Sequence, residues 1–172
     1  ITLPEEQAPI TKRAIHTSAD FEYARTLTFS ENAVAKGLQL IRNGADIVTD
    51  TNMALAGISK PGLQKLGVSA YCYMAESVIA ERAKEEGTTR ARAAMDYAAE
   101  NNPGAILAIG NAPTALLKIA ELLENGLRPA LVIAVPVGFV NVTESKERIL
   151  AACQKHAVPA IAAMGRKRLE LR

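Results

Sequence analysis

Ala105-Ile106-Leu107-Ala108-Ile109 and Ala130-Leu131-Val132-Ile133-Ala134-Val135 are the two stretches that decide the fold. Both are apolar throughout, with no alternation of polar and apolar residues. Such strands are typical of a parallel sheet that is covered on both faces. Between them the sequence predicts a helix over 113–125, because Pro113 suits a first helical turn and Gly126 suits a stop.

The same alternation of strands and helices extends along the chain. Further strands are predicted over 45–49, 69–74 and 158–162. Pro159 in the last of these indicates an edge strand or a late strand start. Further helices are predicted over 31–42 (capped by Ser30), 76–86, 88–100 and 143–156. We therefore expect one domain over residues 1–172: an α/β, three-layer doubly wound fold with a mostly parallel sheet of about five strands and helices on both faces.

Composition excludes several classes of function. The chain has 172 residues, of which 49% are hydrophobic, and a formal charge of +2, which favours neither a nucleic-acid partner nor a membrane surface. Cys72 and Cys153 lie far apart, so we expect two reduced core thiols and no metal site. No apolar run reaches membrane-spanning length and no signal peptide is visible, so a cytoplasmic location is expected.

Familiar catalytic motifs are missing from the sequence. It contains no GxGxxG, no GxxxxGK[ST] and no GxSxG. An enzyme with this sequence would need a chemistry that uses no nucleotide, no metal and no covalent nucleophile.

Small, polar and glycine residues follow the predicted strands. In doubly wound sheets, ligands bind beyond the carboxyl ends of the strands. Two of these segments also have a local explanation, since Gly110-Asn111-Ala112-Pro113 could form a turn with a helix start and Asp50 and Thr51 could be local caps. The segments are Thr49-Asp50-Thr51-Asn52-Met53, Gly110-Asn111-Ala112-Pro113-Thr114, Pro136-Val137-Gly138-Phe139-Val140-Asn141 and Met164-Gly165-Arg166-Lys167.

His16 is one of only two histidines in the chain. Thr17 and Ser18 are residue types that cap helix N-termini, so we expect a helix to start just after His16. A side chain that exchanges protons near neutral pH is a candidate for acid catalysis there, although a lone histidine is more often structural. We interpret His156, at the end of a predicted helix, as structural.

Several motifs together resemble the precorrin-8X methylmutase family (cobalt-precorrin-8 methylmutase in the anaerobic route) of cobalamin biosynthesis. They occur in the family's order from about residue 10 to residue 167. The matching stretches are Lys12 to Phe21 (KRAIHTSADF), Asp46 to Ile58 (DIVTDTNMALAGI), Thr88-Thr89-Arg90, Gly110 to Leu116 (GNAPTAL), Val135 to Val140 (VPVGFV), Glu144-Ser145-Lys146 and Gly165-Arg166-Lys167.

The resemblance implies an isomerase. Such enzymes move a methyl group within ring C of a precorrin-8 type tetrapyrrole by a 1,5-sigmatropic shift, which gives a hydrogenobyrinate-type product. The histidine that matches His16 is the acid toward the ring-C nitrogen. The family is homodimeric, with the corrinoid in a cleft at the dimer interface, and needs no cofactor.

The resemblance also implies a set of substrate-binding residues. The carboxylates of the corrinoid need basic side chains or backbone amides as partners. The basic candidates are Arg13, Lys60, Arg90, Arg166 and Lys167, and the amide candidates lie near Gly110 and Gly138. The remaining candidates are Thr17, Thr49, Asp50, Thr51, Asn111, Pro113, Thr114 and Phe139.

Two other functions stay open. The segments before and after the matching region are shorter than is usual for the family, and a non-catalytic corrinoid-binding or carrier relative would fit such a chain. An unrelated phosphate-binding regulatory domain is a weaker alternative.

Overall fold

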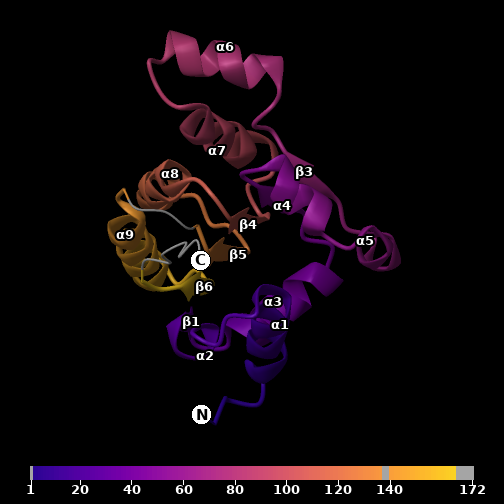
Figure 1. The fold of residues 1–172 in the computed structure, drawn as a ribbon. Helices are drawn as coiled ribbons and strands as arrows, with labels where there is room; N and C mark the ends of the chain where they lie inside the picture. Colours follow the sequence, from indigo (N-terminus) through magenta and orange to yellow (C-terminus); the bar gives the residue numbers. More distant parts are fainter. Residues whose placement is uncertain (1, 137–139, 166–172) are drawn as a thin grey trace.

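A mostly parallel sheet forms the centre of the molecule (Figure 1). In the computed structural model, which describes residues 2–136 and 140–165, its strand order is β1-β6-β5-β4-β2-β3. Neighbouring strands are parallel except β1, which runs antiparallel to β6. The strands are β1 (Leu27–Phe29), β2 (Ile47–Thr49), β3 (Ala70–Cys72), β4 (Ile106–Ile109), β5 (Leu131–Ala134) and β6 (Ala160–Ala163).

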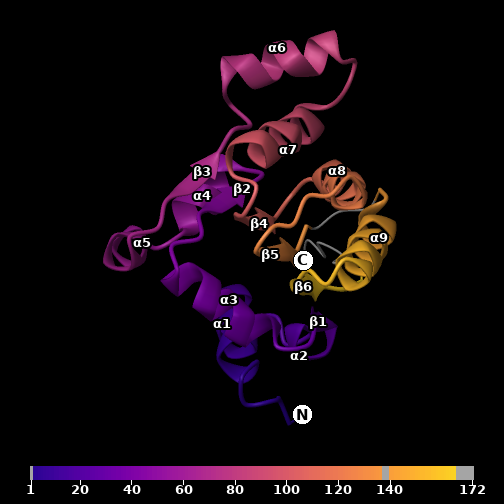
Figure 2. The same ribbon diagram turned by 180° about the vertical axis from the view of Figure 1, so that it is seen from behind.

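Helices cover the two faces of the sheet, which confirms the predicted α/β fold. Helices α7, α8 and α9 lie on one face with α6 outside them, and α1 and α3 lie on the other side (Figures 1 and 2). The helices are α1 (Ala8–Ser18), α2 (Tyr23–Thr26), α3 (Ala33–Arg42), α4 (Asn52–Gly57), α5 (Lys60–Leu66), α6 (Ser77–Glu85), α7 (Arg90–Asn101), α8 (Pro113–Glu124) and α9 (Val142–Lys155).

The apolar strands have two buried faces, as their sequences predict. In β4, Leu107 and Ile109 belong to the larger core under α7, α8 and α9, whereas Ile106 belongs to a smaller core with α3. Successive side chains of a strand point to opposite faces, so an unbroken apolar run serves both layers. Gly37 lets α3 approach closely, since a Cβ there would lie 3.2 Å from a side-chain carbon of Leu131.

The structure adds one strand to the predicted sheet and decides between the two explanations of Pro159. The sheet has a sixth strand, β1, and β6 lies between β1 and β5 rather than at an edge. The late strand start is correct, because β6 begins after Pro159. Ser30 does not cap the following helix. Its hydroxyl accepts a hydrogen bond from the Ala160 amide at 2.9 Å and so ties the end of β1 to the start of β6.

Most predicted helices form near the expected positions. Thr89 caps α7 through a hydrogen bond from the Arg92 amide at 3.2 Å, and Pro113 is the first residue of α8. Helices α1, α2, α4 and α5 were not predicted. Within the described residues, no helix is both long and apolar enough to cross a membrane.

Candidate functional site

The carboxyl ends of the parallel strands form one edge of the sheet, which we call the strand-end site. Its described residues follow β2 (Asp50 and Thr51), β4 (110–114) and β6 (164–165). The chain leaves β2 toward β3 and leaves β4 toward β5, in opposite directions across the sheet. Such a switch point is where doubly wound folds open a crevice for ligands.

Asp50 lies at this switch point and links the segment after β2 to the segment after β4. Its side chain is 1% exposed. Its Oδ1 accepts a hydrogen bond from the Gly110 amide at 2.8 Å, and its Oδ2 accepts from the amides of Asn111 at 2.8 Å and Ala112 at 2.7 Å. These amides were expected to meet substrate carboxylates, but the protein's own carboxylate takes them.

The two threonines beside Asp50 also make bonds within the protein. The Thr49 hydroxyl is buried and donates to the carbonyl oxygens of Thr51, at 3.1 Å, and Tyr71, at 3.3 Å. The Thr51 hydroxyl accepts from the Ala54 amide at 3.1 Å and thereby caps α4. The segment after β2 is therefore fixed by its own side chains, whereas Asn111 is exposed.

Strand β1 brings the segment that carries His16 to the same edge of the sheet. Because β1 is antiparallel to β6, its beginning lies beside the carboxyl end of β6, and the Met164 amide donates to the Thr26 carbonyl at 2.8 Å. Helix α1 packs on α2, and α2 contacts β6. The exposed His16 thus belongs to a helix on the strand-end side. From β2 to β6 the edge spans three inter-strand spacings, about 14 Å.

The predicted helix start after His16 is wrong. His16 lies in the last turn of α1, which is followed by the C-cap Ala19 in the left-handed conformation with φ 56°. The Ser18 hydroxyl donates back to the Ala14 carbonyl at 2.7 Å instead of capping a new helix. The nearby helix terminus is therefore the carbonyl end, whose partial negative charge favours a neighbouring cation, the reverse of what a helix start implies.

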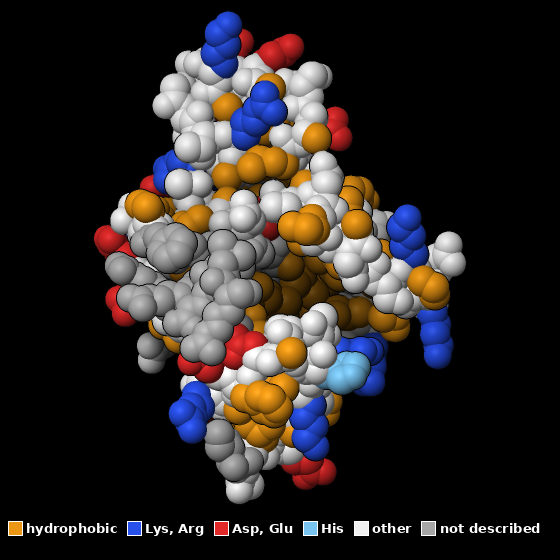
Figure 3. Space-filling model, viewed as in Figure 1, with side chains coloured by type: hydrophobic (Ala, Val, Ile, Leu, Met, Phe, Trp, Pro, Cys, Tyr) orange, Lys and Arg blue, Asp and Glu red, His pale blue; other side chains and the backbone are white. Residues whose placement is uncertain are grey.

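Exposed apolar side chains gather on segments at this edge. Phe21 (80% exposed) precedes α2, Met53 (83%) is in the first turn of α4, and Val140 (76%) precedes α9. Figure 3 shows a hollow on this view of the molecule, between α4 and the part that carries α1 and α3, with hydrophobic side chains on its floor. Such a surface suits a large, partly apolar ligand or a protein partner.

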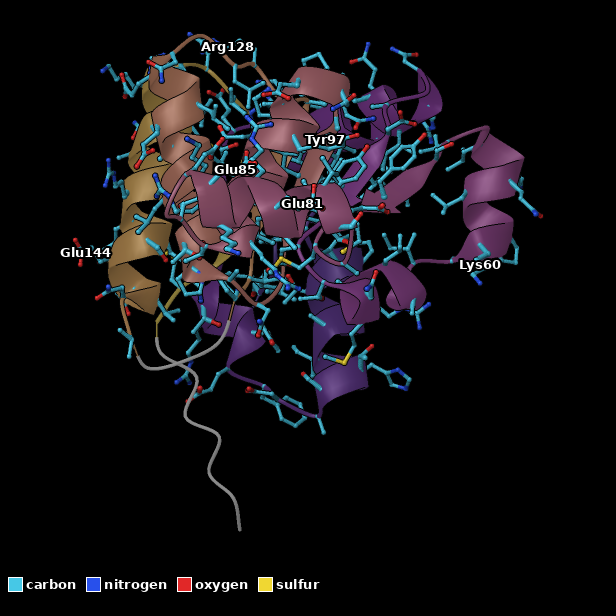
Figure 4. The ribbon with its side chains drawn as sticks, turned by 90° about the horizontal axis from the view of Figure 1, so that it is seen from above. Lys60, Glu81, Glu85, Tyr97, Arg128 and Glu144 are labelled. Atoms are coloured by element: carbon cyan, nitrogen blue, oxygen red, sulfur yellow. The ribbon has the colours of Figure 1, made fainter. Side chains whose placement is uncertain are left out.

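The basic candidates do not all lie together. Arg13 and Arg90 are exposed, Arg13 on α1 and Arg90 at the start of α7. Lys60 begins α5, which lies at the margin of the molecule in Figures 1 and 4. Within one chain, Lys60 is therefore set apart from the sheet.

Among the other candidates, Thr17 is exposed and follows His16, and Pro113 and Thr114 form the first turn of α8. Gly138, Phe139, Arg166 and Lys167 lie outside the described residues.

Lys146 is a buried cation that was quoted in a motif but not predicted as a site residue. It is 2% exposed in the second turn of α9, and its Nζ donates to the carbonyl oxygen of Gly165 at 3.5 Å. Buried lysines need polar partners, so its burial ties α9 to the turn after β6. Its neighbours in the sequence are polar, so hydrophobic periodicity does not predict that Lys146 is buried.

The second histidine is held at the far end of α9. His156 Nδ1 lies 3.1 Å from the Arg128 guanidinium and its Nε2 lies 3.2 Å from a Glu124 carboxylate oxygen, as expected of a structural residue. In Figure 4, Arg128 lies at the top of the view and Glu144, in the first turn of α9, lies at the left. In residues 2–136 and 140–165, no three His, Cys, Asp or Glu side chains cluster as metal ligands would.

Comparisons with known proteins agree with this architecture. The family model described as precorrin-8X methylmutase matches residues 2–167. A cobalt-precorrin-8 methylmutase from Priestia megaterium is 43% identical over 164 residues, which are 95% of this chain and 71% of that protein. One from Salmonella typhimurium is 43% identical over 159 residues, covering 92% of this chain and 72% of that protein.

A solved structure shares the fold. The precorrin-8X methyl mutase from Thermus thermophilus superimposes with a TM-score of 0.87 and 42% sequence identity, over 96% of this chain and 78% of that one. These similarities confirm the expectation that the protein is an isomerase of corrin biosynthesis. The chain therefore belongs to the precorrin-8X methylmutase family.

Proposed function

We propose that the strand-end site moves a methyl group within ring C of a precorrin-8 type tetrapyrrole, with His16 as the acid. The observation that carries this proposal is the antiparallel β1, which brings the helix of His16 to the edge where β2 and β4 end. The relatives are named methylmutases, and nothing in the comparisons favours a non-catalytic carrier.

The chemistry fits a site of this kind. A 1,5-sigmatropic shift needs a polarised ring held in one geometry, and it needs neither a nucleophile nor a cofactor. A proton or hydrogen bond at the ring-C nitrogen draws electron density from the bond to the migrating methyl. A well-placed general acid contributes about 10² to 10⁴ in rate.

Substrate carboxylates would pair with basic side chains. Arg13 is on the same helix as His16, one turn earlier and exposed, so both can face one ligand. Arg90, Arg166 and Lys167 are the further candidates. The amides after β4 do not serve this purpose because they donate to Asp50. Because these amides already donate to Asp50, the phosphate-binding alternative also lacks support at the start of α8.

A homodimer is part of this proposal. Phe21, Met53 and Val140 leave an apolar margin at the strand-end site, and a second copy of the chain would cover it and close the cleft around the macrocycle. Lys60, at the margin of one chain, would then be free to act toward the partner's site. Light scattering over a range of micromolar concentrations tests this, with a dimer expected and a monomer at all concentrations contradicting it.

We propose a cytoplasmic location.

The test of the function is conversion of a precorrin-8 type substrate. We expect the absorption spectrum to change to that of a hydrogenobyrinate-type chromophore while the mass of the ring stays the same, as an isomerisation requires. Arg90→Ala should weaken substrate binding with little effect on the maximal rate. Tight binding of the product without any conversion of substrate would favour the carrier instead.

A further inference from the structure

The side chain of Asp50 joins two loops that leave the sheet in opposite directions. Asp50 directly follows β2, and the amides of Gly110, Asn111 and Ala112 directly follow β4. All three bonds are 2.7–2.8 Å long, short for an amide donor, as is typical when the acceptor is charged. Both carboxylate oxygens are used.

A buried carboxylate needs compensation for its lost hydration. Asp50 is 1% exposed, and three backbone amides donate to its two oxygens. Its compensation comes from the three amides and from the positive end of α8, whose N-cap is Ala112. The geometry of residues 110–112 is therefore coupled to one carboxylate.

This arrangement occupies the place where related architectures hold a ligand. At a switch point, an anion would normally lie at the helix N-terminus. Here the chain supplies the anion itself. The turn after β4 thus offers no free amide to the substrate, and what it presents to solvent is the exposed side chain of Asn111.

We propose that Asp50 is a positioning residue: it holds the turn Gly110–Ala112 so that the Asn111 amide side chain points at the bound tetrapyrrole. The inference rests on the proposed function and deepens it. Asp50 itself touches no substrate. Its effect on the reaction passes through Asn111, the polar group that it fixes in place.

Asp50→Asn removes this restraint with little change in size. An asparagine side chain has one oxygen acceptor, and its NH₂ group would face an amide donor, so at least one of the three bonds is lost. Misplacement of a group that orients substrate by about 1 Å costs up to about 100-fold in rate. We expect kcat to fall by about 10- to 100-fold and KM to change by less than about threefold.

Asp46→Asn is the matched control. Asp46 lies at the opposite end of the same strand, where its side chain accepts from the Ser69 amide at 3.2 Å and from the Asn102 side chain at 3.5 Å. It should lose stability at most and keep kcat. Urea unfolding of both variants separates stability from turnover. Equal kcat for Asp50→Asn and the wild type would overturn the proposal.

A double-mutant cycle tests the route through Asn111. Asn111→Ala truncates an exposed side chain and should leave the fold intact, so it keeps the test decisive even if Asp50→Asn does not fold. We expect it to lower kcat as much as Asp50→Asn does, and the double variant to be no worse than either single one. An Asn111→Ala variant with wild-type kcat, or additive losses in the double variant, would overturn the proposal. If the wild type itself converted no substrate, the proposed function would fail with it.

Discussion

The cap of α4 offers a direct test of whether the segment after β2 belongs to the site. The Thr51 hydroxyl accepts from the Ala54 amide at 3.1 Å, and the Thr89 hydroxyl accepts from the Arg92 amide at 3.2 Å. The two caps are alike in chemistry. Thr51 lies at the strand-end site, whereas Thr89 caps α7.

Replacement of either threonine by alanine removes one cap bond. Each loss should cost about 1 kcal/mol. For a chain of this size, that lowers the melting temperature by about 2–4 °C. Threonine-to-serine variants keep the hydroxyl and should melt within about 1 °C of the wild type.

The activities of the two alanine variants should differ. Helix α4 has only six residues, so loss of its cap loosens the turn beside Asp50, and Thr51→Ala should lower kcat/KM well below that of Thr89→Ala. Calorimetry and turnover are measured on the same samples. Equal activities for Thr51→Ala and Thr89→Ala at equal stability would refute the assignment of this segment to the site.

Three further predictions concern charge, backbone and thiols. Hydrogen bonds from Arg82 lower the pKa of Glu100, so their pairing stabilises the fold above the ordinary carboxyl range and is lost as pH falls through the lowered pKa. The difference in urea midpoint between wild type and Glu100→Gln should therefore be largest at pH 7 and shrink as the pH falls below the ordinary carboxyl range; a difference independent of pH would argue against it. A Cβ at Gly110 would meet nothing nearer than 3.8 Å, so the free energy of unfolding of Gly110→Ala should lie within about 1 kcal/mol of the wild-type value. A larger loss of stability would contradict the turn described. Burial raises the pKa of the Cys153 thiol to about 12, so in a Cys72→Ser variant no thiol should react with a disulfide reagent at pH 8 until the chain unfolds, and fast reaction of the native protein would disprove this burial.

The parallel core was predictable because its signal is strong and local. β4 and β5 are unbroken apolar runs, and a helix between them with Pro113 at its start leaves few other arrangements. β1 was not predictable in this way. It is three residues long, and its pairing with β6 is set by tertiary contacts such as the Ser30 to Ala160 bond.

The site shows the same division. The strand-end position of Asp50 followed from topology, since polar residues after parallel strands meet at one edge. Its three amide bonds could not be predicted, because the turn geometry at 110–112 has no local signature. His16 was placed beside the wrong helix end since Thr17 and Ser18 are good caps, and serine in a last turn can equally bond backwards, as Ser18 does to Ala14.

The most direct test of the account is the single-turnover rate of His16→Ala against that of His156→Ala, with enzyme in excess over a precorrin-8 type substrate. We predict that His16→Ala binds the substrate but converts it about 10²- to 10⁴-fold more slowly than the wild type, whereas His156→Ala, which loses only contacts at the far end of α9, converts it at the normal rate. Conversion by His16→Ala at the wild-type rate would contradict the assignment of the acid to this helix.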